Sequence, residues 1–154
     1  PAAGIIEDGV AGNSNVVVAG DLSGALLDPG AWPILSDKDG NLTEGIGYNL
    51  LMVTDGVIRS PDDRSVLQGV SRRMVFDLAR QLEIPFVEED LQPYDLYTAD
   101  EAFLTNTYFQ LLPVRSVDRR PMSEVPGPIS KQLRAAWCAL VGVDIEGQAL
   151  RAIE

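Results

Sequence analysis

Gly69, Val70 and Ser71 form the segment of this sequence whose residue types are best suited to holding an anion. Apolar residues recur at helical spacing over 69–82, so this tripeptide stands where a helix would begin. The first backbone N–H groups of a helix are unpaired, and the helix dipole and the Ser71 hydroxyl would add to them. Phosphate binding is therefore one interpretation. The commoner one is that Ser71 caps the helix and Gly69 forms a turn.

Thr105, Asn106 and Thr107 form a second cluster of small hydrogen-bonding side chains, directly after a predicted strand. Hydroxyl and amide groups in a turn can build another wall of an anion site. Taken alone, the cluster is a weak indication, because such residues are also common in turns that bind nothing.

Glu44 stands immediately before the bend Gly45-Ile46-Gly47, with the apolar Leu42 and Ile46 close on either side. A carboxylate in that setting either points toward a defined partner or is a solvated turn residue, and the sequence leaves both open. Dinucleotide binding is excluded, because no third glycine follows at the required spacing and no helix is predicted to begin there.

The chain contains no histidine, one cysteine, Cys138, and two lysines, Lys38 and Lys131. Without histidine, Ser-His-Asp triads, Cys-His pairs and the common zinc sites are excluded, and we predict no metal site. Cys138 lies in an apolar run, which favours a buried thiol over a nucleophile. Lys38 falls in a polar turn and Lys131 on a polar helix face, where solvated roles are expected. The remaining chemistry is that of carboxylates, lysines or a bound cofactor.

Acidic residues dominate the charge: 23 Asp and Glu stand against 12 Lys and Arg, for a formal net charge of −11. A chain without a broad basic surface cannot neutralise a phosphate backbone, so no nucleic acid is expected as a partner. No apolar stretch is long enough to span a membrane, and the N-terminal residues lack the pattern of a signal peptide. We therefore expect a soluble, cytoplasmic chain with no membrane partner, which the single cysteine also favours.

Pairs of predicted strands alternate with helices along the chain, which favours a mixed α/β fold. Turn residues at 37–40 and at 54–56 predict two hairpins in series, each turn joining the two strands of one hairpin. The clearest helix is predicted over 69–82. We predict further strands over 85–89, 101–105 and 110–117, a short helix over 93–97, and a helix from 127 to about 141. With 154 residues and 45% hydrophobic content, one core and a single domain are expected.

The segment 1–30 is the least readable part of the chain, because glycines interrupt every periodic pattern. We predict a helix over 14–27, opened by Asn13 or Ser14, although the run Val16-Val17-Val18 favours a strand. The domain division that follows is an N-terminal segment over 1–30, interpreted as helical, and a folded domain over 31–154.

A series of motifs in unbroken order over 31–143 resembles the class IV (fold type IV) pyridoxal-phosphate aminotransferases. The motifs are the segments 42–49, 55–58, 67–72, 97–104, 112–118 and 127–129. The resemblance implies that 31–154 adopts the fold of the larger, C-terminal pseudo-barrel domain of that family. The segment 45–49 is more similar to branched-chain or amine transaminases than to aminodeoxychorismate lyases.

The same resemblance implies a site for pyridoxal 5'-phosphate. Glu44 matches the acid that pairs with the pyridine nitrogen of the cofactor and keeps that nitrogen protonated. Val70 and Ser71 match one phosphate-binding segment of the family, and Asn106 and Thr107 lie in the second. The implied reaction moves an amino group between a small amine or amino acid and a 2-oxo acid. The implied assembly is a homo-oligomer, since family members are commonly dimers.

One motif of the family is missing. Its Schiff-base lysine is expected within 7–13, where the sequence reads Glu-Asp-Gly-Val-Ala-Gly-Asn. No catalytic residue is assigned, and cofactor binding is expected to be noncovalent or absent. Two functions remain open. The chain is an aminotransferase domain, whether fragment, processed chain or degenerate homologue, or it is a non-catalytic homologue that acts as a binding or partner protein.

Overall fold

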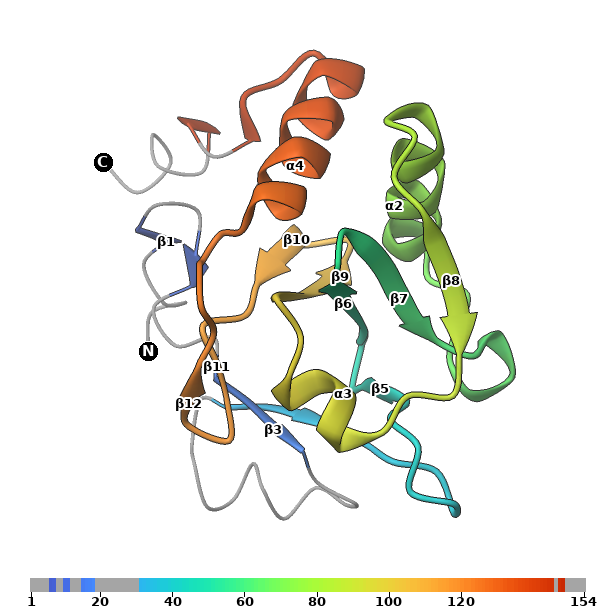
Figure 1. Cartoon of the computed structure of the whole chain (residues 1–154). Helices are drawn as coiled ribbons and strands as arrows, with labels where there is room; N and C mark the ends of the chain where they lie inside the picture. The colour runs from blue at the N-terminus through green and yellow to red at the C-terminus, as the bar shows by residue number, and fades with distance from the viewer. Residues whose placement is uncertain (1–5, 8–9, 12–14, 19–30, 146, 149–154) are drawn as a thin grey trace.

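The computed structural model describes residues 6–7, 10–11, 15–18, 31–145 and 147–148, and its largest element is a six-stranded sheet (Figure 1). The strands are β5 (Glu44–Gly45), β6 (Tyr48–Thr54), β7 (Val57–Pro61), β8 (Phe86–Glu89), β9 (Glu101–Asn106) and β10 (Gln110–Pro113). Their order is β10-β9-β6-β7-β8, and β5 pairs with β6 beside this path. Every pairing is antiparallel except that of β7 with β8.

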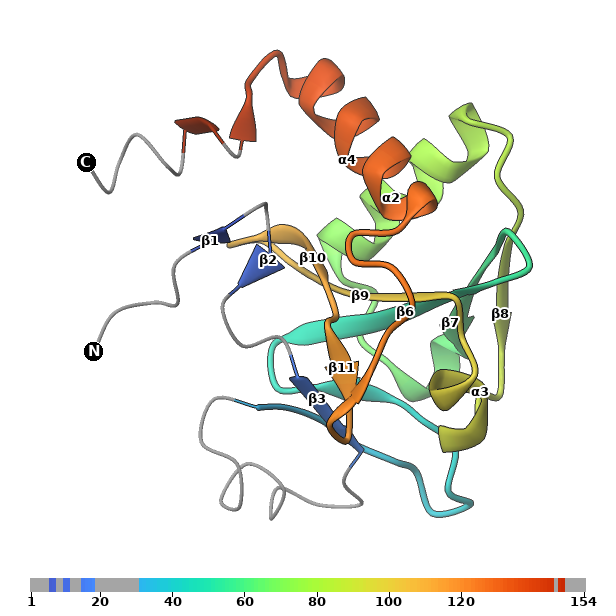
Figure 2. The ribbon, with the colours of Figure 1, turned by 60° about the vertical axis from the view of Figure 1, so that its left-hand side comes forward.

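A smaller sheet lies on one side of the large one and joins segments that are far apart in the sequence (Figure 2). Its members are β3 (Asn15–Val18), β4 (Trp32–Ile34), β11 (Ser116–Val117) and β12 (Arg120–Pro121), in the order β12-β11-β3-β4. Strand β3 runs parallel to both β11 and β4. A further antiparallel pair is formed by β1 (Ile6–Glu7) and β2 (Val10–Ala11).

Strand β3 overturns part of the helix predicted over 14–27. At Asn15–Val18 that prediction is wrong, because the three β-branched valines favour a strand and this strand pairs with β4 on one side and, through Asn15 and Val16, with β11 on the other. The rest of the predicted helix from residue 19 onward, and Ser14 before it, lie outside the described residues.

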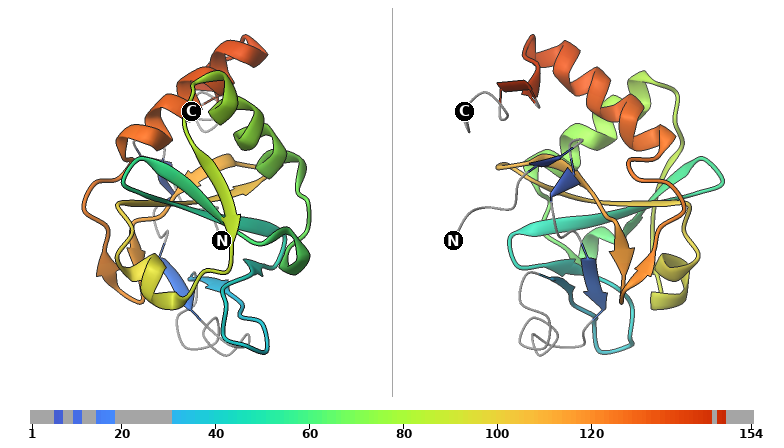
Figure 3. Two further views of the ribbon diagram at one scale, coloured as in Figure 1. Left: turned by 45° about the vertical axis from the view of Figure 1, so that its right-hand side comes forward. Right: turned by 90° about the vertical axis from the view of Figure 1, so that its left-hand side faces the viewer.

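Two long helices cover the other face of the large sheet (Figure 3). They are α2 (Val70–Gln81) and α4 (Pro128–Val141), and the shorter helices are η1 (Asp63–Ser65) and α3 (Pro93–Tyr97). Phe103 on β9 packs in the apolar cluster beneath the long helices, and the next residue, Leu104, packs in the cluster toward the small sheet. Adjacent strand residues point to opposite faces, so β9 is buried on both sides. The predicted single mixed α/β unit is thereby confirmed.

Most predicted elements are confirmed near their expected positions, including both long helices and the hairpin at 54–56. In that hairpin Asp55 and Gly56 both have positive φ, 51° and 75°, as a tight turn of this hand requires. The strand predicted over 110–117 is instead two strands in different sheets. The chain leaves the large sheet after Val114. The N–H of Val114 still donates to the carbonyl of Ala102 on β9, but the carbonyl of Arg115 accepts from the N–H of Met122.

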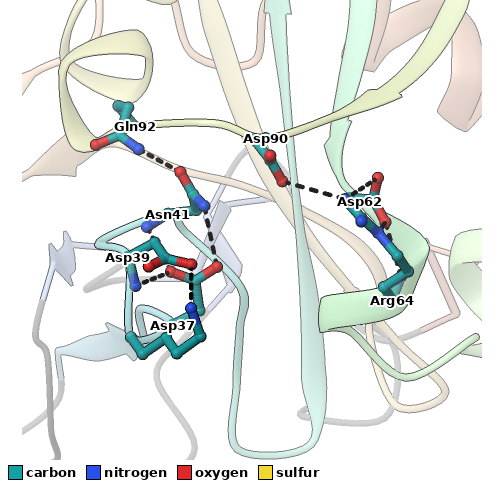
Figure 4. A network of polar contacts seen from close by, with 8 residues as sticks. Asp37, Asp39, Asn41, Asp62, Arg64, Asp90 and Gln92 are labelled. Atoms are coloured by element: carbon teal, nitrogen blue, oxygen red, sulfur yellow. Dashed lines mark hydrogen bonds and ion pairs between the residues drawn. The ribbon is translucent and has the colours of Figure 1, made fainter.

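One carboxylate organises the predicted turn at 37–40 (Figure 4). Asp37 accepts from the backbone N–H of Asp39 at 2.8 Å and of Asn41 at 2.9 Å, and from the Asn41 side-chain amide at 3.0 Å. The hydrogen bond from the Asn41 side chain is the largest cause that lowers the pKa of Asp37. Gln92, directly before α3, donates to Asn41 and so ties this turn to that helix.

Helix α4 begins against a buried carboxylate that comes from the large sheet. Glu101 on β9 accepts from the N–H of Ile129 at 2.8 Å, the N–H of Ser130 at 2.9 Å and the Ser130 hydroxyl at 2.6 Å. Gly127 at the N-cap supplies no capping side chain, and a Cβ there would lie 2.2 Å from Cδ of Glu101. The glutamate therefore replaces the usual capping residue. None of the described helices combines the length and apolar character needed to cross a membrane.

Candidate functional site

A cavity of about 300 Å³ lies between the start of α2, the β5–β6 hairpin and the turn after β9. Its lining is uncharged apart from Glu44. Every residue that the sequence assigned to a cofactor belongs to this lining, which comprises Glu44, Gly45, Gly47, Tyr48, Asn49, Leu67, Gly69, Val70, Ser71, Thr105, Asn106 and Thr107.

Strand register brings these distant segments together. Asn49 on β6 is paired with Glu44 on β5 and, across its other edge, with Thr105 on β9. The Asn49 side chain reaches further, because its amide donates to Glu44 Oε2 at 2.8 Å and to the Leu67 carbonyl at 2.9 Å. Sequence reasoning assigned Asn49 no role. The available signal was a polar residue inside the otherwise apolar strand 48–53, since buried polar side chains normally have a specific partner.

The start of α2 presents its backbone donors to the cavity. No side chain caps the helix at Gly69, and the first helical bond runs from the N–H of Arg73 to the Gly69 carbonyl at 2.9 Å. The N–H groups of Val70, Ser71 and Arg72 precede that bond and have no partner within the helix, and Val70 and Ser71 both line the cavity. Gly69 fits only as glycine, because a Cβ would lie 2.3 Å from Oδ1 of Asn49. Ser71 is buried and lines the cavity instead of capping the helix from the N-cap position.

Glu44 is held in a defined position, which decides between the two roles that the sequence left open. Its Oε2 accepts from the Asn49 side chain and from the backbone N–H of Leu67 at 3.0 Å. Within the part of the chain that the structure describes, no hydrogen bond occupies Oε1. One carboxylate oxygen is thus anchored to the protein and the other is available to a ligand in the cavity.

The end of β9 and the turn after it contribute three residues with different roles. Asn106 Oδ1 accepts from the N–H of Tyr108 at 2.9 Å and of Phe109 at 3.0 Å, so its carbonyl oxygen holds the turn itself. Thr107 is exposed at the cavity. Thr105 is only 1% exposed, and its buried hydroxyl has no hydrogen-bond partner among the residues that the structure describes. A buried hydroxyl without a partner is costly, so this one suits a bound polar ligand.

Tyr48 closes the cavity from the side of the small sheet. Its hydroxyl donates to the Pro33 carbonyl at 2.8 Å, and its ring meets Trp32 edge to face at 5.2 Å between centroids. Burial raises the pKa of Tyr48, so the hydroxyl remains a donor. The ring leaves no room for a side chain at Gly45, where a Cβ would lie 1.9 Å from Cε2 of Tyr48. This wall is therefore rigid.

Both lysines lie at the surface, as the sequence predicted. The side chain of Lys38 is 86% exposed and pairs with Asp39, and that of Lys131 is 55% exposed and pairs with Glu124. Neither lines the cavity. Most of the stretch 7–13, where the family lysine was expected, lies outside the described residues. In the described ranges, no group of three or more metal-binding side chains is placed to hold a metal ion.

The lining fits a ligand that carries a phosphate and a basic ring nitrogen. Phosphate oxygens accept hydrogen bonds. Donors are supplied by the backbone at the start of α2 and by the hydroxyls of Ser71, Thr105 and Thr107. Glu44 supplies the complementary acceptor. Because Gly45 and Gly69 sit where a Cβ would strike a neighbour, the backbone of both is brought close to the side chains that form the cavity.

Comparison with known proteins places this chain beside a group of enzymes. The family described as Amino-transferase class IV matches residues 26–117. The branched-chain-amino-acid aminotransferase of Pseudomonas aeruginosa is 33% identical over 117 residues, which cover 75% of this chain. The chain spans between 35% and 38% of the length of the curated relatives that it matches.

Solved structures of such enzymes share the fold. The branched-chain amino acid aminotransferase of Escherichia coli superposes with a TM-score of 0.78 at 29% identity, covering 83% of this chain and 52% of that one. The branched-chain amino acid aminotransferase of Thermobaculum terrenum, solved in its PLP-form, gives a TM-score of 0.72 at 31% identity, covering 80% and 41%.

Proposed function

This chain belongs to the class IV aminotransferase family, and from that premise we propose that its cavity binds pyridoxal 5'-phosphate without a covalent bond to the chain. The proposed domain that carries the site is the C-terminal-type domain over 31–154. Relatives named as branched-chain-amino-acid aminotransferases support an amino acid or a 2-oxo acid as the second ligand.

The observation that carries this proposal is the convergence of Glu44, Val70, Ser71, Asn106 and Thr107 on one cavity. These residues come from three separate segments of the sequence, and the family motifs assign each of them to the cofactor. A related structure in its PLP-form has the same fold, which adds support.

Each of these residues has a distinct part in the proposed complex. The N–H groups of Val70 and Ser71, with the hydroxyls of Ser71 and Thr107, would hold the phosphate. Glu44, fixed by Asn49 and Leu67, would hold the proton on the ring nitrogen. When bound, pyridoxal phosphate supplies an aldehyde that reacts with amines and a ring that withdraws electrons.

We propose that amino-group transfer by this chain is absent or lowered by orders of magnitude. Covalent attachment and movement of the substrate proton both need an amine close to the cofactor aldehyde. The stretch 7–13 contains no lysine, and Lys38 and Lys131 are exposed, paired and outside the cavity lining. The chain is therefore best described as a noncovalent binding domain of an aminotransferase family.

Titration with pyridoxal phosphate tests both parts of the proposal. We expect saturable, reversible binding with the absorbance of the free aldehyde retained, and no mass increase after borohydride reduction. Failure to bind at millimolar concentration would remove the binding function. A reduced adduct on Lys38 or Lys131, with turnover lost when that lysine becomes alanine, would instead show that the chain carries its own reactive amine.

Glu44→Gln isolates the contact with the ring nitrogen. Glutamine keeps an acceptor for the N–H of Leu67 but cannot hold a pyridinium proton by charge. We expect the affinity for pyridoxal phosphate to fall about 10- to 100-fold, the range of one hydrogen bond to a charged group. A phosphate-bearing benzaldehyde analogue, with carbon in place of the ring nitrogen, should bind both proteins alike. Equal losses for the two ligands would place the ring nitrogen elsewhere.

A further inference from the structure

Arg72 is a buried cation in the first turn of α2, directly behind the cavity. Its side chain is 4% exposed, whereas that of its neighbour Arg73 is 67% exposed. A positive charge at the positive end of a helix dipole is unfavourable, and burial adds the cost of desolvation. Such a residue is stable only if the surrounding groups satisfy its guanidinium.

Three acceptors from three different segments do so. Nε donates to the Ser60 hydroxyl on β7 at 3.0 Å, Nη1 donates to Oε1 of Gln68 at 2.9 Å, and Nη2 donates to Oε1 of Glu88 on β8 at 2.5 Å. Ser60 in turn donates to the Pro61 carbonyl at 3.1 Å. The guanidinium thus connects the loop before α2 and the helix itself to two strands of the large sheet.

The contact with Gln68 is the one that reaches the site. Gln68 directly precedes Gly69, the residue from which α2 begins. Gly69, Val70 and Ser71 line the cavity, and among the described residues no side-chain cap holds the start of the helix at Gly69. Arg72 itself is not part of the cavity lining. Any influence on a ligand must therefore pass through the backbone that it holds.

We propose that Arg72 is a positioning residue that sets the backbone donors of Val70 and Ser71 for a phosphate group. This inference rests on the proposed function, because it assumes that the cavity takes a phosphate-bearing ligand. If Arg72 had a merely structural role, its substitution would loosen the fold and lower the affinity for every ligand of the cavity. A positioning role predicts a selective loss of phosphate recognition.

The chain offers a matched control for this test. Arg72→Met and Arg73→Met remove the same charge from adjacent positions of one helix, but among the described residues Arg73 makes an exposed ion pair with the nearby Asp77 and covers the Phe76 ring. Any general effect of lost positive charge on anion binding appears in both variants. The difference in affinity between the two variants therefore measures the contribution of the buried hydrogen bonds of Arg72. Arg72→Lys keeps the charge and loses the planar array of donors.

The measurement compares pyridoxal phosphate with pyridoxal, which lacks the phosphate. We expect Arg72→Met to lower the affinity for pyridoxal phosphate about tenfold or more and the affinity for pyridoxal less than about twofold. Arg72→Lys should be intermediate, and Arg73→Met should bind both ligands almost as the native chain does. If Arg72→Met fails to fold, Gln68→Ala decides, because it removes only the loop contact from an exposed position. We expect it to lower the preference for the phosphorylated ligand by about threefold or more.

Two unfavourable outcomes are distinguishable. If the native chain binds pyridoxal phosphate and pyridoxal equally, or neither, the proposed phosphate site fails and the role of Arg72 fails with it. If the native chain prefers the phosphorylated ligand and that preference is unchanged in Gln68→Ala and in a folded Arg72 variant, the phosphate site stands and only the positioning role is overturned. Amide shifts of Val70 and Ser71 on titration with inorganic phosphate provide an independent readout of the same donors.

Discussion

Replacing Glu101 by alanine is expected to lower the free energy of unfolding of this domain by about 3–5 kcal/mol. The carboxylate accepts from two backbone N–H groups and one hydroxyl at the start of α4, and Glu101 and Ser130 are both buried. Alanine removes the acceptor of all three donors, and the buried Ser130 loses two of these hydrogen bonds. Helix α4 packs on the large sheet through Leu133 and Trp137, so loosening its first turn also weakens the core.

Glu124 provides the control, since it lies close to the same helix but is exposed. Within the described residues its side chain makes an ion pair with Lys131 at 2.8 Å, so Glu124→Ala should change stability by less than about 1 kcal/mol. Glu101→Gln keeps the shape of the side chain but turns one acceptor into a donor, and should fall between the two. Chemical denaturation of the three variants measures the differences. Similar losses for Glu101→Ala and Glu124→Ala would show that the buried carboxylate does not cap α4.

The parts of the fold that the sequence predicted correctly are those whose signals are local. The helix over 70–81 follows from the spacing of Val75 and Leu78, and the β6–β7 turn follows from Asp55 and Gly56. The errors lie in segments whose conformation depends on pairing with residues far away in the sequence. Strand β3 exists because Asn15 and Val16 pair with Ser116 and Val117, about one hundred residues later in the chain. No periodicity within 14–27 carries that information.

The candidate site shows the same division. Glu44 and Ser71 were identified because a carboxylate before a glycine bend and a hydroxyl at a helix start are visible in short windows, and the family motifs placed them in order. Asn49 and Arg72 were not assigned roles, and Thr105 was recognised only as a member of the polar cluster 105–107. Their importance depends on which groups surround them, and for Arg72 those groups come from β7, β8 and the loop before α2. Spacing along the chain does not reveal such a set.

Ser71→Asp is expected to reduce the affinity for pyridoxal phosphate by at least about 100-fold while leaving the fold intact. The new carboxylate would stand in the first turn of α2, where negative charge stabilises a helix by about 0.3–1 kcal/mol. It would also face a phosphate held by the same N–H groups. Two like charges about 4 Å apart near a protein surface repel by about 4 kcal/mol, which is more than the expected loss requires.

This substitution adds a like charge at the proposed phosphate site, which removing Ser71 would not do; because Ser71 is buried, its effect on folding combines the favourable dipole contribution with a desolvation cost. In the Ser71→Asn variant the new side chain has nearly the same volume as aspartate but carries no charge. This variant should lose far less affinity for pyridoxal phosphate. Pyridoxal should bind the aspartate and asparagine variants about equally, since it has no phosphate to repel. Thermal unfolding and ligand titration on the same samples give both quantities. If the aspartate variant is as stable as the native chain and still binds pyridoxal phosphate as tightly as Ser71→Asn does, the phosphate does not lie at the start of α2.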